Sequence, residues 1–144
     1  MFAYTFDHPL VVEVLLAARG RGLKVRIYAD NTRIQASRNE SAALQRLECY
    51  GVEIRSVRPK GGDLHAKLLV ADSRLLLGSM NFTTNSQRNE ERNVEIALSR
   101  KGLTAVSEDV HRLASLSKPL ESGSGLRSGH DPEFHLWMRA SRGM

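Results

Sequence analysis

The first 57 residues alternate short segments rich in β-branched and aromatic side chains with longer segments of helical periodicity, and this alternation constrains the fold more than any other feature. Residues 24–30 (KVRIYAD) and 52–57 (VEIRSV) have the composition of strands, whereas residues 10–18 and 40–50 repeat apolar side chains at helical spacing. Alternating strands and helices favour parallel strands covered by helices. We therefore predict an α/β fold.

Short signals mark the ends of these segments. Residues 7–9 (DHP) supply a capping side chain and a first-turn proline for a helix that ends at Gly20. Residues 1–4 (MFAY) are typical of the end of a β-strand, so we expect that strand to begin upstream; they lack the basic region and cleavage site of a signal peptide. Residues 31–39 form a polar stretch for which no strand or helix is predicted.

The second half has a different pattern. Residues 65–71 and 74–77 are two short apolar strands separated only by Asp72 and Ser73, which predicts a hairpin. Residues 93–98 predict a further strand, and residues 102–116 predict a helix. The hairpin adds antiparallel strands to the parallel ones, so the predicted sheet is mixed and flanked by helices.

The composition changes at Lys118, where proline, serine and glycine become frequent. We predict one folded domain over residues 1–117 and a flexible C-terminal tail over residues 118–144. Residues 134–138 (FHLWM) could form a short docking helix, but disorder is the prediction for the whole tail.

The charge and the single cysteine restrict the possible functions. A net charge of +5 and a pI near 9.8 favour an anionic partner, although a solvated basic surface has the same composition. Cys49 alone can build neither a disulfide framework nor a cysteine-rich zinc site, which fits a soluble protein in a reducing, intracellular compartment. The apolar stretch 10–18 is shorter than the ~20 residues of a membrane span and contains Glu13, so no transmembrane anchor is predicted.

The most informative stretch is 64–96, because it combines two patterns of reactive residues. His65, Lys67 and Asp72 form the pattern H-x-K-x4-D. The pattern G-S-x-N follows at residues 78–81, and its polar side chains are Ser79 and Asn81. Residues two apart in a strand share a face, so the imidazole and the ammonium project together. An imidazole can attack phosphorus while an ammonium neutralises the charge that develops on its oxygens. The hydroxyl and the amide can donate to the same phosphate, and this chemistry needs no metal.

These residues resemble the HKD motif of the phospholipase D superfamily, in particular its single-motif branch of bacterial endonucleases and mitochondrial cardiolipin hydrolase. The resemblance covers residues 2–116. It implies a phospholipase D-like fold and a metal-independent phosphodiesterase that has no cofactor and forms a phosphohistidine intermediate. The implied catalytic residues are His65, Lys67 and Asp72, the last of them structural or orienting, and the implied phosphate-binding residues are Ser79 and Asn81.

A phosphohistidine mechanism also needs a general acid, and one histidine cannot fill both roles. The other histidines (His8, His111, His130 and His135) do not repeat the His-x-Lys context. A two-fold homodimer would bring His65 of each copy to one phosphate, because an isologous interface places identical residues opposite each other. The resemblance implies the same arrangement, since members of this family carry two motifs in one chain or across a homodimer.

The sequence departs from the family pattern at two places. Five residues separate Asp72 from Gly78 where the branch usually has six, which would displace the phosphate donors. Arg92 stands where the branch usually has a glutamate, next to the asparagine matched by Asn93. Two nearby carboxylates, Glu91 and Glu95, are therefore the candidates for orienting the histidine.

The substrate class stays open between a phospholipid headgroup and a nucleic acid backbone. Basic residues before the motif form either a track for a polyanion or a solvated loop: Arg55, Arg58 and Lys60. Others could line the entrance: Arg88, Asn89 and Arg92. A location on the mitochondrial surface is implied only by the resemblance. The alternatives to an enzyme are a non-catalytic phosphate- or nucleic-acid-binding module with a degenerate motif, and an unstable fragment with an open sheet edge.

Overall fold

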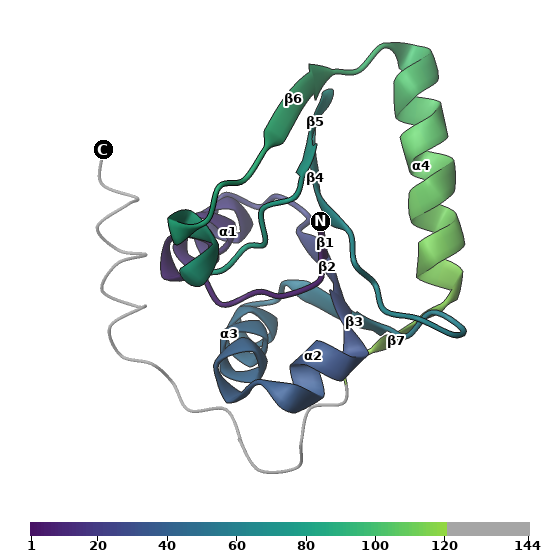
Figure 1. The fold of residues 1–144 in the computed structure, drawn as a ribbon. Helices are drawn as coiled ribbons and strands as arrows, with labels where there is room; N and C mark the ends of the chain where they lie inside the picture. The colour runs from purple at the N-terminus through teal and green to yellow at the C-terminus, as the bar shows by residue number, and fades with distance from the viewer. Residues whose placement is uncertain (121–144) are drawn as a thin grey trace, which may run out of the picture.

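A seven-stranded mixed sheet forms the centre of the computed structural model, which describes residues 1–120 (Figure 1). The strand order is β6-β5-β4-β1-β2-β3-β7. The strands are β1 (Phe2–Ala3), β2 (Arg26–Asp30), β3 (Glu53–Val57), β4 (Lys67–Ala71), β5 (Arg74–Gly78), β6 (Asn93–Ala97) and β7 (Ser117–Pro119). β1, β2 and β3 are parallel, and all the other pairings are antiparallel. The predicted α/β fold with a mixed sheet and flanking helices is confirmed.

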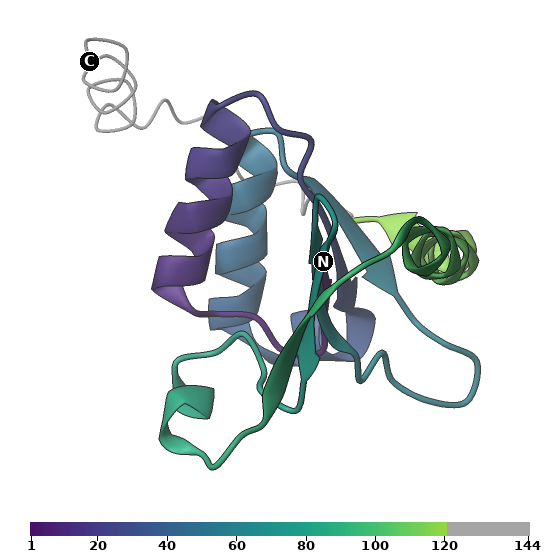
Figure 2. The same cartoon turned by 90° about the horizontal axis from the view of Figure 1, so that it is seen from above.

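Helices cover both faces of this sheet. They are α1 (Pro9–Gly20), α2 (Asn31–Ala36), α3 (Arg38–Cys49) and α4 (Arg100–Ser115), with a short 3₁₀ turn, η1 (Asn85–Arg88). Viewed from above, α1 and α3 lie side by side on one face and α4 lies on the other (Figure 2). No helix within residues 1–120 has both the length and the apolar character needed to cross a membrane.

Each face of the sheet has its own apolar core. The larger cluster joins the inner faces of α1 and α3 to the strands through side chains such as Leu16, Leu44, Ile27 and Ile54. The smaller one lies beneath α4, where Phe2 stacks on Tyr28 with the ring centroids 4.7 Å apart. The two-residue strand β1 therefore contributes to both clusters, because neighbouring side chains in a strand point to opposite faces.

The polar stretch 31–39 contains a helix that the sequence pattern did not predict. α2 is only six residues long, too short to show a periodic apolar face. It forms because Asp30, the last residue of β2, caps it by accepting a hydrogen bond from the Arg33 backbone N–H at 3.0 Å. Ser37 caps α3 in the same way, since its hydroxyl accepts from the Glu40 backbone N–H.

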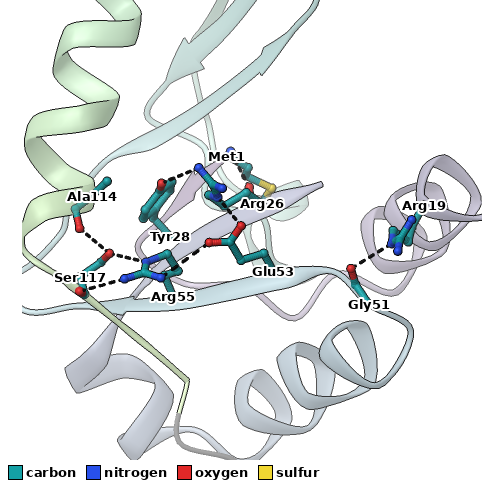
Figure 3. A network of polar contacts seen from close by, with 9 residues as sticks. All are labelled: Met1, Arg19, Arg26, Tyr28, Gly51, Glu53, Arg55, Ala114 and Ser117. Atoms are coloured by element: carbon teal, nitrogen blue, oxygen red, sulfur yellow. Dashed lines mark hydrogen bonds and ion pairs between the residues drawn. The ribbon is translucent and has the colours of Figure 1, made fainter. Parts of the chain in front are cut away.

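The predicted domain boundary at residue 117 is too early, because Ser117–Pro119 form β7 along the edge of β3. Figure 3 shows the contacts that hold this strand: the Arg55 guanidinium donates to the Ser117 hydroxyl at 2.6 Å and to its carbonyl at 3.2 Å. The Ser117 hydroxyl in turn donates to the carbonyl of Ala114 in α4. Proline and serine at 117–119 obscured this edge strand in the sequence. The predictions of a flexible tail and of a docking helix at 134–138 fall on residues outside those described.

The predicted hairpin is confirmed, and its turn consists of Asp72 and Ser73. Asp72 has a φ of 53°, the left-handed conformation that two-residue hairpin turns require and that aspartate tolerates. The two strands pair in register, with Leu69 opposite Leu76. β6 then pairs with β5 and is exposed along its full length.

One buried carboxyl group makes the stability of this fold depend on pH. Glu40 is 2% exposed, and burial raises its pKa from 4.5 to about 7, although the Phe6 backbone N–H donates a hydrogen bond to it and Arg33 lies near. Between these two pH values the unfolded chain has released a proton that the folded chain retains. Stability therefore falls as the pH rises through this interval.

We expect Glu40→Gln to remove this dependence, because glutamine keeps the acceptor for Phe6 and cannot ionise. At pH 8 the variant should be more stable than the wild type by about 2–3 kcal/mol, and at pH 4 the two should be equal. Urea unfolding at several pH values measures the difference, with the exposed Glu108→Gln as a control that changes neither value. Parallel stability curves for wild type and Glu40→Gln would contradict the assignment.

Candidate active site

His65 and Lys67 form the centre of the candidate site. The Lys67 ammonium nitrogen lies 3.0 Å from Nδ1 and 3.2 Å from Nε2 of the His65 ring, and it donates to the His65 carbonyl oxygen at 2.9 Å. An ammonium can only donate, so the ring nitrogen that it contacts carries a lone pair. The lysine is buried and the histidine is exposed. The pair thus presents an imidazole to solvent above a buried cation.

His65 does not lie in a strand, contrary to the prediction from residues 65–71, because β4 begins at Lys67. The backbone just before the strand is instead held by Asp30. Its carboxylate accepts a hydrogen bond from the Leu64 backbone N–H at 2.7 Å, and its other oxygen caps α2. Asp30 is only 1% exposed. This buried carboxylate fixes the residue that precedes the histidine, so we regard it as part of the site's support.

The ring of Tyr4 forms a wall beside the pair. Its centroid lies 4.3 Å from that of the His65 ring, at an interplanar angle of 50°, and 4.8 Å from the Lys67 ammonium nitrogen. The Arg33 guanidinium lies 5.4 Å from the same centroid. Cations are attracted to the electron-rich face of an aromatic ring. Tyr4 therefore restricts the positions of both site residues, and the sequence pattern gave no sign of it.

The Gly-Ser-x-Asn segment packs against the start of β6. A Cβ on Gly78 would collide with the side chain of Asn93 and with the Arg92 carbonyl oxygen, so only glycine permits this close approach. The Ser79 backbone N–H donates to the same carbonyl at 3.0 Å. The Asn81 side-chain oxygen is buried without a hydrogen-bond partner within residues 1–120. Asn81 and Lys67 line a common cavity, so the asparagine faces the same space as the ammonium.

The structure distinguishes the two candidate carboxylates. Glu91 accepts a hydrogen bond from the Ser79 hydroxyl and another from Asn89 at 3.3 Å, and these bonds lower its pKa. Burial lowers the pKa of Lys67, and the nearby Glu91 partly opposes this effect. Glu95 instead forms an ion pair with Arg74, toward the turn of the hairpin. Of the two carboxylates, the structure thus places Glu91 beside Ser79 and near Lys67, whereas Glu95 is paired with Arg74.

Asp72 lies away from the other motif residues. It sits in the exposed hairpin turn that follows β4, whereas Lys67 begins that strand. At about 3.3 Å per residue, the length of the strand separates the two. The aspartate of the motif is thus a turn residue, and a direct catalytic role does not fit its position.

The basic residues near the motif do not form one track. Arg55 is bound to Ser117 and Glu53, so its guanidinium holds β7 against the edge of the sheet (Figure 3). Arg58 and Lys60 are exposed in the loop before the site. Of the entrance residues, Asn89 donates to Glu91, as described above, and the Arg92 guanidinium donates to the Glu91 carbonyl. Arg88 is exposed at the end of η1.

The other described histidines have contacts outside the His65–Lys67 pair, although His8 lines the same cavity as Lys67. His8 caps α1 by accepting from the Leu10 backbone N–H, and its second nitrogen lies 2.6 Å from the Gln87 amide. His111 is exposed on α4. In the described part of the chain, no cluster of three histidine, cysteine or acidic residues is arranged to hold a metal ion.

Known proteins resemble this chain over most of its length. Residues 1–113 match the family model described as the PLD-like domain of cardiolipin synthase. The chain is 29% identical to mitochondrial cardiolipin hydrolase from Xenopus tropicalis over 111 residues, which are 76% of this chain and 51% of that protein. It is 32% identical to a phospholipase D from Rickettsia conorii over 97 residues, 67% of this chain and 46% of that one. The chain spans about half the length of these curated relatives.

A solved structure shows the same fold. Nuc from Salmonella typhimurium, a phospholipase D family member, superposes with a TM-score of 0.78 at 27% sequence identity. The match covers 85% of this chain and 80% of the Nuc chain. The sheet and helices described above are therefore shared with that protein.

Proposed function

Since the chain belongs to the phospholipase D-like family, we propose that it is a phosphodiesterase that acts through a phosphohistidine intermediate at His65. The observation that carries this proposal is the contact of the Lys67 ammonium with the ring nitrogens of His65. This contact supports the proposal, because a phosphate that meets the exposed imidazole would also lie beside the buried ammonium. The cavity wall formed by Asn81 extends the same anion site.

The proposed reaction has two displacements at phosphorus. A ring nitrogen of His65 attacks, the P–N bond forms, and the P–O bond to the leaving alkoxide breaks as an acid protonates that oxygen. The resulting base then takes a proton from water, whose oxygen attacks phosphorus and breaks the P–N bond. Lys67 stabilises the charge on the phosphoryl oxygens in both steps. Ser79 assists by exchanging its hydrogen bond from Glu91 to the bound phosphate.

The acid and base is proposed to be His65 of a second copy of the chain. The described histidines other than His65 are committed to a helix cap or lie on α4, away from this cluster. An isologous dimer supplies the missing group without any further residue type. One phosphate then lies between two imidazoles that exchange the roles of nucleophile and acid.

A binding module without turnover is the second candidate, and one observation favours it. The Ser79 hydroxyl donates to Glu91, which places a carboxylate beside the expected phosphate position. A carboxylate there repels a phosphate, and the shortened hairpin is the feature of the sequence that could have shifted these donors. In this candidate Lys67 and Asn81 hold an anion, but no covalent intermediate forms.

The proposed substrate is a phosphodiester of a phospholipid, such as cardiolipin, or of a single-stranded nucleic acid. The site contacts described above recognise only the phosphate that both classes share. The exposed Arg58 and Lys60 support a nucleic acid backbone. The match to a cardiolipin hydrolase supports a lipid.

Hydrolysis of bis-p-nitrophenyl phosphate in excess EDTA tests the enzyme against the binding module. The enzyme releases nitrophenolate and forms an acid-labile phosphoprotein on rapid quenching, whereas the module binds phosphate without either product. Cardiolipin vesicles and single-stranded oligonucleotides, assayed in parallel, then assign the substrate class. A folded dimer that shows neither nitrophenolate release nor a phosphoprotein would reject the enzyme.

Tyr4→Leu is expected to lower kcat about tenfold, because the ammonium and the imidazole both lose the ring that restricts them. Tyr4→Phe keeps the ring and should stay near the wild-type rate. Nitrogen NMR of the His65 ring provides a readout that a general loss of stability would not change: its tautomer signals should broaden in Tyr4→Leu only. Equal losses in the two variants would assign the effect to the hydroxyl group and contradict this role.

A further inference from the structure

Arg33 is a cation beside the candidate site that the proposed reaction does not use. Its guanidinium carbon lies over the ring of Tyr4, 5.4 Å from the ring centroid. The His65 ring centroid lies 4.3 Å from the same point, and the Lys67 ammonium nitrogen lies 4.8 Å from it. The guanidinium and the imidazole are therefore no further apart than the sum of their distances to Tyr4, so one small molecule can contact both.

The backbone fixes the relative position of Arg33 and the proposed nucleophile. One oxygen of the buried Asp30 carboxylate accepts a hydrogen bond from the Arg33 backbone N–H at 3.0 Å. The other oxygen accepts from the Leu64 backbone N–H at 2.7 Å, and Leu64 directly precedes His65. A single carboxylate thus holds both segments, and the guanidinium belongs to the surroundings of the site.

The Arg33 side chain has unused capacity to bind an anion. Its Nε is buried without a hydrogen-bond partner within residues 1–120, and none of the ion pairs in that part of the chain involves Arg33. The residue as a whole is half-buried, so part of it remains accessible. Glu40 lies near, but burial raises the pKa of Glu40 to about 7. That carboxyl therefore neutralises the guanidinium less than an ordinary glutamate does.

The two proposed substrate classes share a second phosphate as well as the first. In cardiolipin, the three carbons of one glycerol join two phosphates. In a nucleic acid strand, the C5′, C4′ and C3′ atoms of one sugar join neighbouring phosphates in the same way. Both substrates thus present two phosphates separated by three carbon atoms, whereas a phospholipid with a single phosphate does not.

We propose that Arg33 binds the second phosphate of such a substrate while His65 and Lys67 act on the first. The inference rests on the proposed function, because it takes the reacting phosphate to lie at the His65–Lys67 pair. A planar guanidinium suits this task, since two of its N–H groups can donate to two oxygens of one phosphate. Arg33 thereby selects a phosphodiester with a second phosphate three carbons away over an isolated phosphodiester.

A purely structural role for Arg33 is the alternative. The guanidinium would then only hold the Tyr4 ring and offset the buried carboxyl groups of Asp30 and Glu40. Its replacement would in that case weaken the binding of all phosphates to the same extent, through the shared wall of the site. Binding of a second phosphate predicts a loss that depends on whether the ligand has one.

The first test compares the affinities of 1,3-propanediol bisphosphate and propyl phosphate, measured by calorimetry. We expect the wild type to prefer the bisphosphate, and the ratio of the two affinities to fall about tenfold in Arg33→Gln. Arg33→Lys keeps the charge and should retain part of the ratio. The matched control is Arg38→Gln, which removes the same charge from an exposed residue at the start of α3 and should keep the wild-type ratio. Circular dichroism checks the folding of each variant.

Two pairs of substrates then identify the source of the second phosphate. Cardiolipin is compared with phosphatidylglycerol, and the dinucleotide pTpT is compared with TpT. In each pair only the first member has a second phosphate three carbons from the phosphodiester. A preference in kcat/KM that Arg33→Gln removes should appear in the lipid pair for a lipid hydrolase and in the dinucleotide pair for a nuclease.

Nitrogen NMR of the Arg33 Nε provides a readout that needs no variant. Its signal should shift when the bisphosphate is added and stay in place with propyl phosphate. An unshifted signal, an affinity ratio that Arg33→Gln leaves unchanged, or a ratio that falls equally in Arg38→Gln overturns the inference. A bisphosphate preference that only Arg33→Gln removes, in a protein that turns over none of the substrates, supports the role of Arg33 and rejects the proposed enzyme.

Discussion

His65→Asn is expected to reduce turnover of bis-p-nitrophenyl phosphate by about 10⁴-fold or more, because the replacement removes the proposed nucleophile and, in a dimer, the acid as well. Asparagine retains a polar side chain of similar size beside Lys67. His65 is exposed, and its ring contacts the side chains of Tyr4 and Lys67, so the free energy of unfolding should change little. The measurement is steady-state turnover in EDTA, together with urea unfolding.

The matched control is His111→Asn, on the exposed side of α4, which should leave turnover unchanged. Rapid quenching adds an independent readout, since the acid-labile phosphoprotein should be absent from His65→Asn and present in the control. Turnover that survives at more than a few per cent in His65→Asn would mean that another residue forms the intermediate.

Asp30→Ala should produce the largest loss of stability among single substitutions near the site. The carboxylate is 1% exposed and accepts hydrogen bonds from the backbone N–H groups of Leu64 and Arg33. Alanine leaves both donors unsatisfied and removes the cap of α2, at a cost of about 3 kcal/mol. It also releases the backbone before His65, and a displaced nucleophile lowers kcat about 10²-fold.

Urea unfolding and kcat, measured on the same preparations below the unfolding transition, separate the two effects. Asp109→Ala is the control, because that carboxylate is exposed and pairs with Arg112 in the same helix. Wild-type kcat in a destabilised but folded Asp30→Ala would show that Asp30 supports the fold and does not position His65.

The major elements of the fold could be predicted because each carries its own periodic or compositional signal. The strand at 24–30 and the apolar periodicity of α1 and α3 depend only on local sequence. α2 and β7 lack such a signal. α2 exists because Asp30 caps it, and β7 exists because Arg55 binds Ser117, so both depend on partners that the local pattern does not contain.

The site was predictable to a similar extent. His65 and Lys67 follow from a two-residue spacing, which places both on one side of the chain even though the strand begins only at Lys67. Tyr4 and Asp30 could not be found in this way, because Tyr4 contacts His65, and Asp30 binds the neighbouring Leu64, from positions more than 30 residues away in the sequence. A clue to Asp30 was present, since an acidic residue directly follows the apolar residues 27–29 (IYA) at the end of a strand.

The two-residue strand β1 joins the halves of the domain. It pairs with β2 on one side and with β4 on the other, and the chain leaves it directly into Tyr4. The hairpin that carries Lys67 and the parallel strands that carry Asp30 are thus joined through Phe2 and Ala3, and we call this two-residue connection the seam. A transient opening of this seam would separate the two halves of the site without unfolding either one. Amide exchange at Phe2 and Ala3 should therefore report how often the assembled site exists, and ligands that bridge the seam should slow that exchange.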